Sequence, residues 1–388
     1  MKADAARPSK PLFDDLRDIR LDFFRGLAMA IIFIAHFPDN QLTLWIPARF
    51  GYSDATEIFV FCSGMASGLA FGKVYQKKGY IQGTQKISFR IWQVYWAHIC
   101  QFIVIASILI YLTTNFSFNR DYVDDLNLYP FFKEPTYNLP ALLYLGYVPN
   151  YFDILPLYLI ILAAIPLVIA VERYFGATVA MLFCLSVWAV SQFSVLELSA
   201  EPWSNRTWFF NPFGWQILFF VGFALSSGWI KISPFLYHRA LIWAYSIVLL
   251  ILIPFAHYSI NQSIPSFHGL AEFLRQLSQK TALGPLRLLH FYCLAMIAVY
   301  FSGPEGARLH WRAPFSYLQI FIVALGRNSL AVFIASLLIC QLLAIVRDHS
   351  LGRGSLLVDC GFTLIGFLVL YTITIISQNY RGYLRRIL

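Results

Sequence analysis

Long apolar stretches recur along almost the whole chain, and they constrain its fold more than any other feature. Each is about 20 residues long, which is the length that a helix needs to cross a bilayer. The chain is 59% hydrophobic and only 13% charged, a composition that a water-soluble protein of 388 residues does not carry. The sequence therefore predicts an all-α, polytopic integral membrane protein and leaves no room for a large soluble domain.

Hydropathy, caps and helix breakers locate about ten transmembrane helices. They are expected at residues 21–37, 54–74, 88–112, 153–171, 176–196, 212–229, 240–258, 286–303, 326–346 and 354–377. Asp54 with Glu57 resembles a capping pair, and Asn211-Pro212 resembles a cap followed by proline at the first helical position. We expect a cytoplasmic segment at 1–20, a transmembrane domain at 21–378 and a basic cytoplasmic tail at 379–388.

Lys and Arg gather in the loops on one side of the predicted helices, which places both termini in the cytoplasm. The three longest loops, 113–152, 197–211 and 259–285, then face the outside. The net charge of +9 follows from this topology and forms no basic helix of the kind that binds nucleic acid. The six cysteines are scattered singly, so neither a metal site nor a disulfide framework is expected.

The first predicted helix carries a charged residue near one end and a histidine at the other. Arg25 and His36 are eleven residues apart, close to three helical turns and about 16–17 Å, so both project from nearly the same face. With the N-terminus inside, Arg25 lies near the cytoplasmic surface and His36 toward the outer side. The first apolar run lacks a cleavage site of small residues, so we expect it to be retained.

This pairing suits transfer of an acyl group across a membrane. Histidine is the usual general base for taking a proton from an attacking hydroxyl, and the donors of an arginine match phosphate oxygens. A thioester cofactor could bind from the inside and present its acyl group near His36. The plainer alternatives are an interfacial arginine and a structural histidine.

Six segments carry a family resemblance that covers essentially the whole chain. They are RDIRLDFFRGLAM (17–29), SDATEIFVFCSGMASG (53–68), FDILPLYL (152–159), NPFGWQILFFVGF (211–223), GPLRLLHF (284–291) and LGRNSLAVF (325–333). In order and spacing they resemble the OpgC family of membrane glucan succinyltransferases, within the acyltransferase-3-like superfamily. Similar proteins often carry an acidic residue just before the first-helix histidine, whereas this chain has Ala35. A group that orients His36 would then come from another helix.

The resemblance implies an enzyme of the bacterial inner membrane. It would move an acyl group, succinyl or acetyl, from cytoplasmic acyl-CoA to a hydroxyl of a periplasmic glucan or another exported glycan, without a metal. Arg25 would match the arginine that faces CoA, and His36 the catalytic histidine. The expected partners are the glycan acceptor and membrane lipids, and the oligomeric state is left open.

Two carboxylates compete for the role of orienting His36. Glu57 and Asp153 each begin a predicted helix on the outer side, where a carboxylate is also favoured by the helix dipole alone. Arg287 and His290 share one face of the eighth predicted helix. Because a buried arginine is costly, Arg287 is expected either to hold a succinyl carboxylate or to pair with Asp153 or Glu57.

Arg327 and Asn328, predicted to begin the ninth helix, are candidates for contact with CoA phosphates; ordinary snorkelling is the alternative. Trp203, Arg206 and Trp208 lie in an outer loop and could contact sugar rings or form part of an aromatic belt.

Two other functions remain open at this point. One is an acetyltransferase for another polysaccharide or a lipid-linked sugar. The other is a transporter or flippase of a polar or lipid-linked substrate, although a carrier normally places its main charges near the midplane and shows pseudo-symmetric halves. Neither feature is apparent in this sequence.

Overall fold

The computed structural model describes residues 18–387, and within that range the protein is helical and contains no β-strand. The longer helices are α1 (Ile19–His36), α2 (Ala55–Ser67), α4 (Tyr80–Asn115), α8 (Ile154–Phe175), α9 (Ala177–Ser191), α10 (Pro212–Ser227), α11 (Arg239–Ala256), α14 (Pro285–Ser302), α15 (Phe315–Arg327), α16 (Ser329–Ser350) and α17 (Leu356–Ile387). The shorter ones are α3 (Lys73–Lys78), α5 (Tyr122–Asp125), α6 (Tyr129–Lys133), α7 (Pro135–Leu143), α12 (Tyr258–Ser263) and α13 (His268–Leu277). A π-helical turn, Gly68–Gly72, joins α2 to α3.

A helix lies at each of the ten predicted positions, so the all-α class is confirmed. Within the described residues, however, only seven helices are long and apolar enough to cross a membrane: α2 with its continuation to Lys78, α4, α8, α11, α14, α16 and α17. Helices α9, α10 and α15 are apolar but shorter. The number of spans and the side of the termini stay predictions. Residues 1–17 of the predicted N-terminal segment lie outside the described residues.

The region of the ninth predicted helix differs from the expectation. Arg327 does not begin that helix: it is the last residue of α15, and Asn328 joins α15 to α16. Helix α15 itself was not predicted, because it has only 13 residues and the prediction searched for apolar stretches of about 20.

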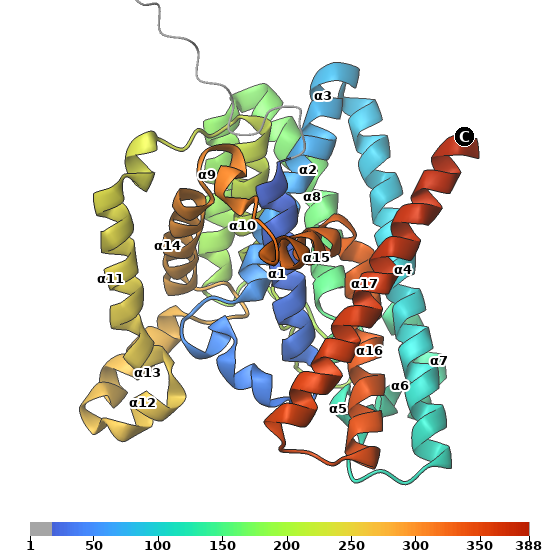
Figure 1. Ribbon diagram of the computed structural model, residues 1–388. Helices are drawn as coiled ribbons and strands as arrows, with labels where there is room; N and C mark the ends of the chain where they lie inside the picture. The colour runs from blue at the N-terminus through green and yellow to red at the C-terminus, as the bar shows by residue number, and fades with distance from the viewer. Residues whose placement is uncertain (1–17, 388) are drawn as a thin grey trace, which may run out of the picture.

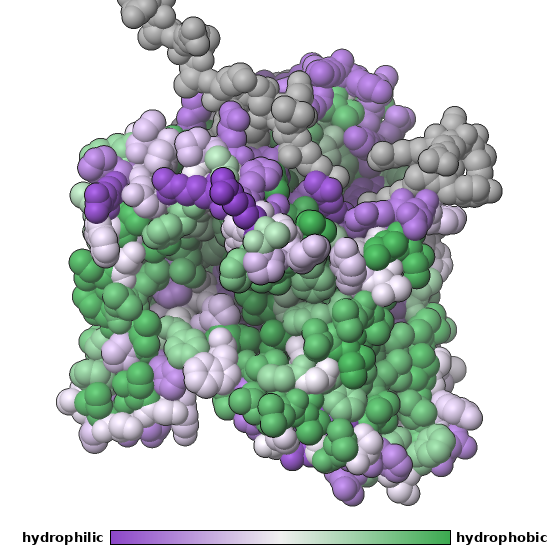
Figure 2. Space-filling model, viewed as in Figure 1, coloured by the Kyte–Doolittle hydropathy of each residue, from purple (hydrophilic) through white to green (hydrophobic). Residues whose placement is uncertain are grey.

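The molecule has two polar edges separated by an apolar band on the side seen in Figure 2. We call the edge that holds the start of α1, helix α3 and the end of α17 the upper face (Figure 1). The edge that holds the end of α1 with α5–α7, α12 and α13 is the lower face. Two of the three predicted outer loops, 113–152 and 259–285, coincide with these short helices, so they fold rather than extend.

Local sequence explains several helix starts and contacts. Asp54 and Glu57 form the predicted capping box of α2, and Asn211 caps α10 ahead of Pro212, which confirms both predictions. Gly64 of α2 lies against the backbone of α10, where an added Cβ would stand 2.0 Å from the carbonyl oxygen of Phe219. Close approach of this kind is the usual use of small residues between membrane helices.

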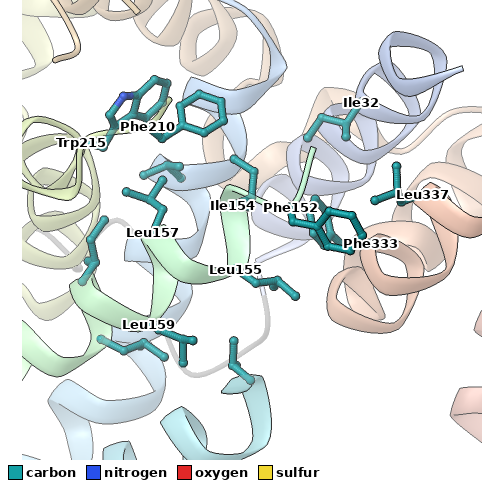
Figure 3. Packing of buried hydrophobic residues seen from close by; sticks show 14 of the residues in the cluster. Ile32, Phe152, Ile154, Leu155, Leu157, Leu159, Phe210, Trp215, Phe333 and Leu337 are labelled. Carbon is teal, nitrogen blue, oxygen red and sulfur yellow. The ribbon is translucent and has the colours of Figure 1, made fainter. Parts of the chain in front are cut away.

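Apolar side chains from α1, α8 and α16 fill the centre of the fold. Figure 3 shows Ile32 of α1 and Phe333 of α16 close to Phe152 and Ile154, where the chain enters α8. This core holds the end of α1 beside the start of α8, and a polar cavity adjoins it at that point.

Candidate active site

A cavity of about 880 Å³ lies where α1 ends and where α2 and α8 begin. Its polar walls come from elements far apart in the sequence, and its lining includes His36, Asp39, Arg49, Asp54, Arg120, Asp125, Tyr151, Asp153, Arg206, Trp208 and Lys280. Apolar side chains such as Ile32 and Ile154 complete it. The cavity therefore combines a wide volume with charges of both signs, which is typical of a site for a polar substrate.

His36, the predicted base, is the last residue of α1 and lines this cavity. The edge of its half-buried ring meets Tyr151, with ring centroids 5.2 Å apart. Its Nδ1 is buried and has no hydrogen-bond partner among the described residues. Lys280 and Asp54 are near enough to act on the ring electrostatically. The imidazole thus faces the cavity without a carboxylate bound to it.

Asp153 precedes α8 and lines the same cavity as His36. It is 7% exposed, and its Oδ1 is buried without a hydrogen-bond partner in the described part of the chain. Burial raises the pKa of this carboxyl to about 7, although Arg206 and backbone amides act in the opposite direction. Asp153 is therefore a carboxyl that changes its charge near neutral pH and lines the same cavity as the predicted base.

Glu57, the other candidate for orienting His36, is fully buried and already has partners. Its Oε1 accepts a hydrogen bond from Nε of Arg287 at 2.7 Å, and its Oε2 accepts one from the backbone amide of Asp54 at 2.7 Å. Glu57 is not among the residues that line the cavity. Of the two carboxylates, the structure brings only Asp153 to the cavity that holds His36.

Lys280 and Asp54 form an ion pair at the cavity, and this pair was not predicted from the sequence. Nζ of Lys280 lies 2.6 Å from Oδ2 of Asp54 and also stands over the rings of Phe209 and Phe210. Burial disfavours ionisation of Asp54, but Lys280 and Arg287 outweigh it and hold the pKa of this carboxyl well below its usual range. Lys280 lies in the connection between α13 and α14, where no helical periodicity could have placed it near α2.

Arg287 and His290 lie on α14 and are both buried. Arg287 binds Glu57 and has Nη2 3.6 Å from Oδ2 of Asp54, so two carboxylates occupy it. Nδ1 of His290 is 2.7 Å from the hydroxyl of Ser53. Neither residue lines the cavity. For Arg287, pairing with Glu57 is the arrangement that the structure shows.

The three predicted loop residues take different positions. Arg206 lines the cavity while its guanidinium binds Glu201 at 2.9 Å and the carbonyl of Val148 at 2.8 Å. Trp208 also lines the cavity and is 3% exposed. Trp203 lies outside it, with its ring centroid 5.4 Å from that of Tyr147. Arg206 and Trp208 are thus the two that could meet a ligand in the cavity.

The predicted cofactor residues gather toward the upper face. Nη2 of Arg25 lies 2.5 Å from the hydroxyl of Ser329, the first residue of α16, so Arg25 stands beside the junction that contains Arg327 and Asn328. Nε of Arg327 is 3.2 Å from Oδ2 of Asp22. Asn328 is 1% exposed, and within residues 18–387 its buried Oδ1 has no hydrogen-bond partner. The three residues come from two distant parts of the sequence and meet around the start of α16.

The cavity and the group of Arg25, Arg327 and Asn328 lie at different levels along α1. The cavity lining on α1 extends from His36 to Ile31, and Arg25 is not part of it. No group of three or more metal-ligating side chains occurs among the residues that the structure describes. Arg120, which also lines the cavity, forms ion pairs with Asp39 and Asp125. These pairs were not predicted from the sequence.

These features define a polytopic helical protein of membrane type with a polar cavity at one end of its first helix. The chain belongs to the OpgC protein family, whose sequence profile matches residues 17–382, and this confirms the resemblance seen in the six segments. Neither the curated proteins nor the solved structures contain a significant match. Membership of the family indicates a membrane acyltransferase-like function.

Proposed function

We propose that this protein is an O-acyltransferase of the bacterial inner membrane that transfers succinyl from cytoplasmic acyl-CoA to a hydroxyl of a periplasmic glucan. The observation that carries the proposal is the placement of His36 in a large polar cavity at the opposite end of α1 from Arg25. Family membership supports the acyl-transfer chemistry. In this proposal the upper face is cytoplasmic and the lower face periplasmic.

The chemical step is a direct transfer between thioester and hydroxyl. His36 removes the proton of an acceptor hydroxyl while the hydroxyl oxygen attacks the thioester carbonyl carbon. The new C–O bond forms, the C–S bond breaks, and the thiolate that leaves takes the proton back from the imidazolium. No covalent enzyme intermediate is required, because positioning of both reactants in one cavity supplies much of the rate.

Asp153 is our choice for the carboxyl that stabilises the imidazolium of His36. It shares the cavity with His36, whereas both oxygens of Glu57 are engaged elsewhere. In the ionised form Asp153 would favour the charged ring. We assign Glu57 to holding Arg287 and the start of α2 in place.

The donor is held, in this proposal, through its phosphates at the upper face. Arg25, Arg327 and Asn328 surround the start of α16, where the first backbone amides of the helix add to the arginine donors. The thioester-bearing arm of the donor would then have to span about 16–17 Å, the rise of eleven helical residues, to bring the acyl group to His36. This is a distance for an extended arm, not for the nucleotide itself.

A succinyl donor also brings a free carboxylate, which needs a cation at the cavity. The sequence pointed to Arg287, but that guanidinium is held by Glu57 and Asp54 away from the cavity. Lys280 borders the cavity and acts electrostatically on His36. We therefore assign the succinyl carboxylate to Lys280. Arg206 and Trp208 are left as contacts for the glycan.

The test uses His36→Gln in detergent-purified protein, with succinyl-CoA and a glucan oligosaccharide. We expect the donor to raise the melting temperature as it does for the wild type, while transfer falls by about 100-fold or more. His349→Gln, on an exposed histidine at the end of α16, is the matched control and keeps activity. Normal turnover in His36→Gln would falsify the proposal. Stabilisation by glycan alone, with none by CoA, would favour a carrier instead.

A further inference from the structure

A second, small void lies between α2, α8 and α10, further along these helices than the cavity. Its volume is about 10 Å³, room for about one water molecule, and it shares Ile154 with the cavity. The other residues that line it belong to α2, α8 and α10: Phe59, Val60, Ser63, Leu157, Tyr158, Ile161 and Phe219. Ile154, the first residue of α8, therefore borders both spaces.

The spacing of these residues shows that the void follows the helices. On α2 the cavity touches Thr56 and the void touches Val60 and Ser63, steps of four and three residues that stay on one helix face. On α8 the void continues from Ile154 through Leu157 to Ile161 with the same periodicity. The seam between α2 and α8 thus runs from the His36 cavity toward the level of Arg25.

One electrostatic interaction and one chain of contacts relate the upper end of this seam to Arg25. Arg25 acts electrostatically on the thiol of Cys62, the residue next to Ser63. Arg25 also binds Ser329, and Phe333, one turn further along α16, stacks on Phe59 with ring centroids 6.0 Å apart. Phe59 lines the void. The stacked pair therefore stands between the Arg25–Ser329 contact and the void.

We propose that the seam between α2 and α8 binds the thioester-bearing arm of the donor, and that Phe59 closes it in this structure. This inference rests on the proposed function. The walls are apolar apart from Ser63 and Tyr158, which suits a slender, unbranched chain with a few polar groups. A turn of Phe59 about its side-chain bonds, away from Phe333, would open the void toward the Arg25–Ser329 contact.

Filling the seam tests the proposal. In Ser63→Leu the larger side chain occupies the void, so we expect transfer of succinyl to fall by about 100-fold. The rise in melting temperature with CoA stays, because the phosphates bind at the upper face. Ser186→Leu makes the same change at an exposed position of α9 and keeps the wild-type rate. A wild-type rate in Ser63→Leu overturns the proposal.

Smaller changes cover the case in which Ser63→Leu does not fold. The transfer rate should fall as the side chain at position 63 becomes larger, from Ser63→Ala through the wild type to Ser63→Thr. Transfer rates that do not depend on this side-chain volume count against the inference. Phe59→Ala removes the closing ring, and we expect hydrolysis of succinyl-CoA without acceptor to rise several-fold as water reaches the thioester. Unchanged hydrolysis contradicts the role of Phe59. If the wild type itself neither transfers succinyl nor responds to CoA, the proposed function has failed instead.

Discussion

Gly26 of α1 and Gly326 of α15 face each other where the two helices cross. A Cβ on Gly26 would stand 1.8 Å from the carbonyl oxygen of Ile322, and one on Gly326 would stand 1.8 Å from that of Asp22. Each would also lie within 3.0 Å of the backbone nitrogen of the other glycine. This crossing holds the end of α15, and with it Arg327, beside the part of α1 that carries Arg25.

The crossing predicts that Gly26→Ala is strongly unfavourable. The obstacle is backbone, which cannot turn aside as a side chain does, so the helices must separate. We expect the free energy of unfolding to fall by about 1–3 kcal/mol or more, read as a lower melting temperature. Gly361→Ala on α17 is the matched control: its Cβ would meet no atom of the described residues within 4 Å. Alanine there should be neutral or stabilising by up to about 1 kcal/mol.

The buried pair of Arg287 and Glu57 predicts a coupled effect of two substitutions. Arg287→Met leaves the carboxylate of Glu57 buried without its partner, and breaking such pairs costs about 3–5 kcal/mol. In the double variant with Glu57→Gln no buried charge is stranded, so part of the stability returns. A double-mutant cycle in melting temperature measures this. Losses that simply add would show that the two groups do not depend on each other.

The positions of the helices could be predicted because apolar length and helix caps are local signals. The capping box at Asp54 and Glu57 is an example: both partners lie within one turn of the chain. Local chemistry also singled out His36 and Arg25. What local patterns missed was α15, whose 13 residues fall short of a span.

The ion pairs and contacts around the cavity could not be predicted from the sequence. Lys280 meets Asp54 across 226 positions of sequence, and only the fold brings the 259–285 loop to the start of α2. Arg287 was expected either to hold a substrate or to pair with a carboxylate, and burial of Glu57 next to it was the missing fact. The choice between Glu57 and Asp153 likewise depended on which one borders the cavity, which spacing along the chain does not reveal.

Donor affinity should depend on Arg25. If its guanidinium binds a CoA phosphate, Arg25→Gln removes a charge-assisted hydrogen bond worth about 1.5–3 kcal/mol, so the Kd for CoA rises by about tenfold or more. Arg173→Gln, an exposed arginine at the end of α8, provides the control. Titration calorimetry with CoA measures both. Equal affinities in the two variants would remove Arg25 from the donor site.

Lys280 should set the preference between donors. In Lys280→Gln the cation is lost, so kcat/KM for succinyl-CoA falls by more than that for acetyl-CoA, which has no free carboxylate. Losing the ion pair with Asp54 should affect the activity with both donors alike, so comparing the two donors in one variant removes this effect from the result. Arg275→Gln, on an exposed side chain of α13, serves as the control. A parallel fall for both donors would show that Lys280 only supports the fold.

The raised pKa of Asp153 predicts a pH dependence with a definite sign. An unfolded chain releases this proton near pH 3.9, whereas the folded protein keeps it to about pH 7 because the carboxyl is buried. Between these values the native state binds the extra proton, so this group's contribution to stability falls as pH rises. Asp153→Asn lacks that fall. Its melting temperature relative to the wild type should therefore increase from pH 5 to pH 8. Asp54→Asn is the comparison: the pKa of Asp54 is lowered, so its difference from the wild type stays constant over this range. Parallel curves for Asp153→Asn and the wild type would mean that Asp153 is already ionised at pH 5.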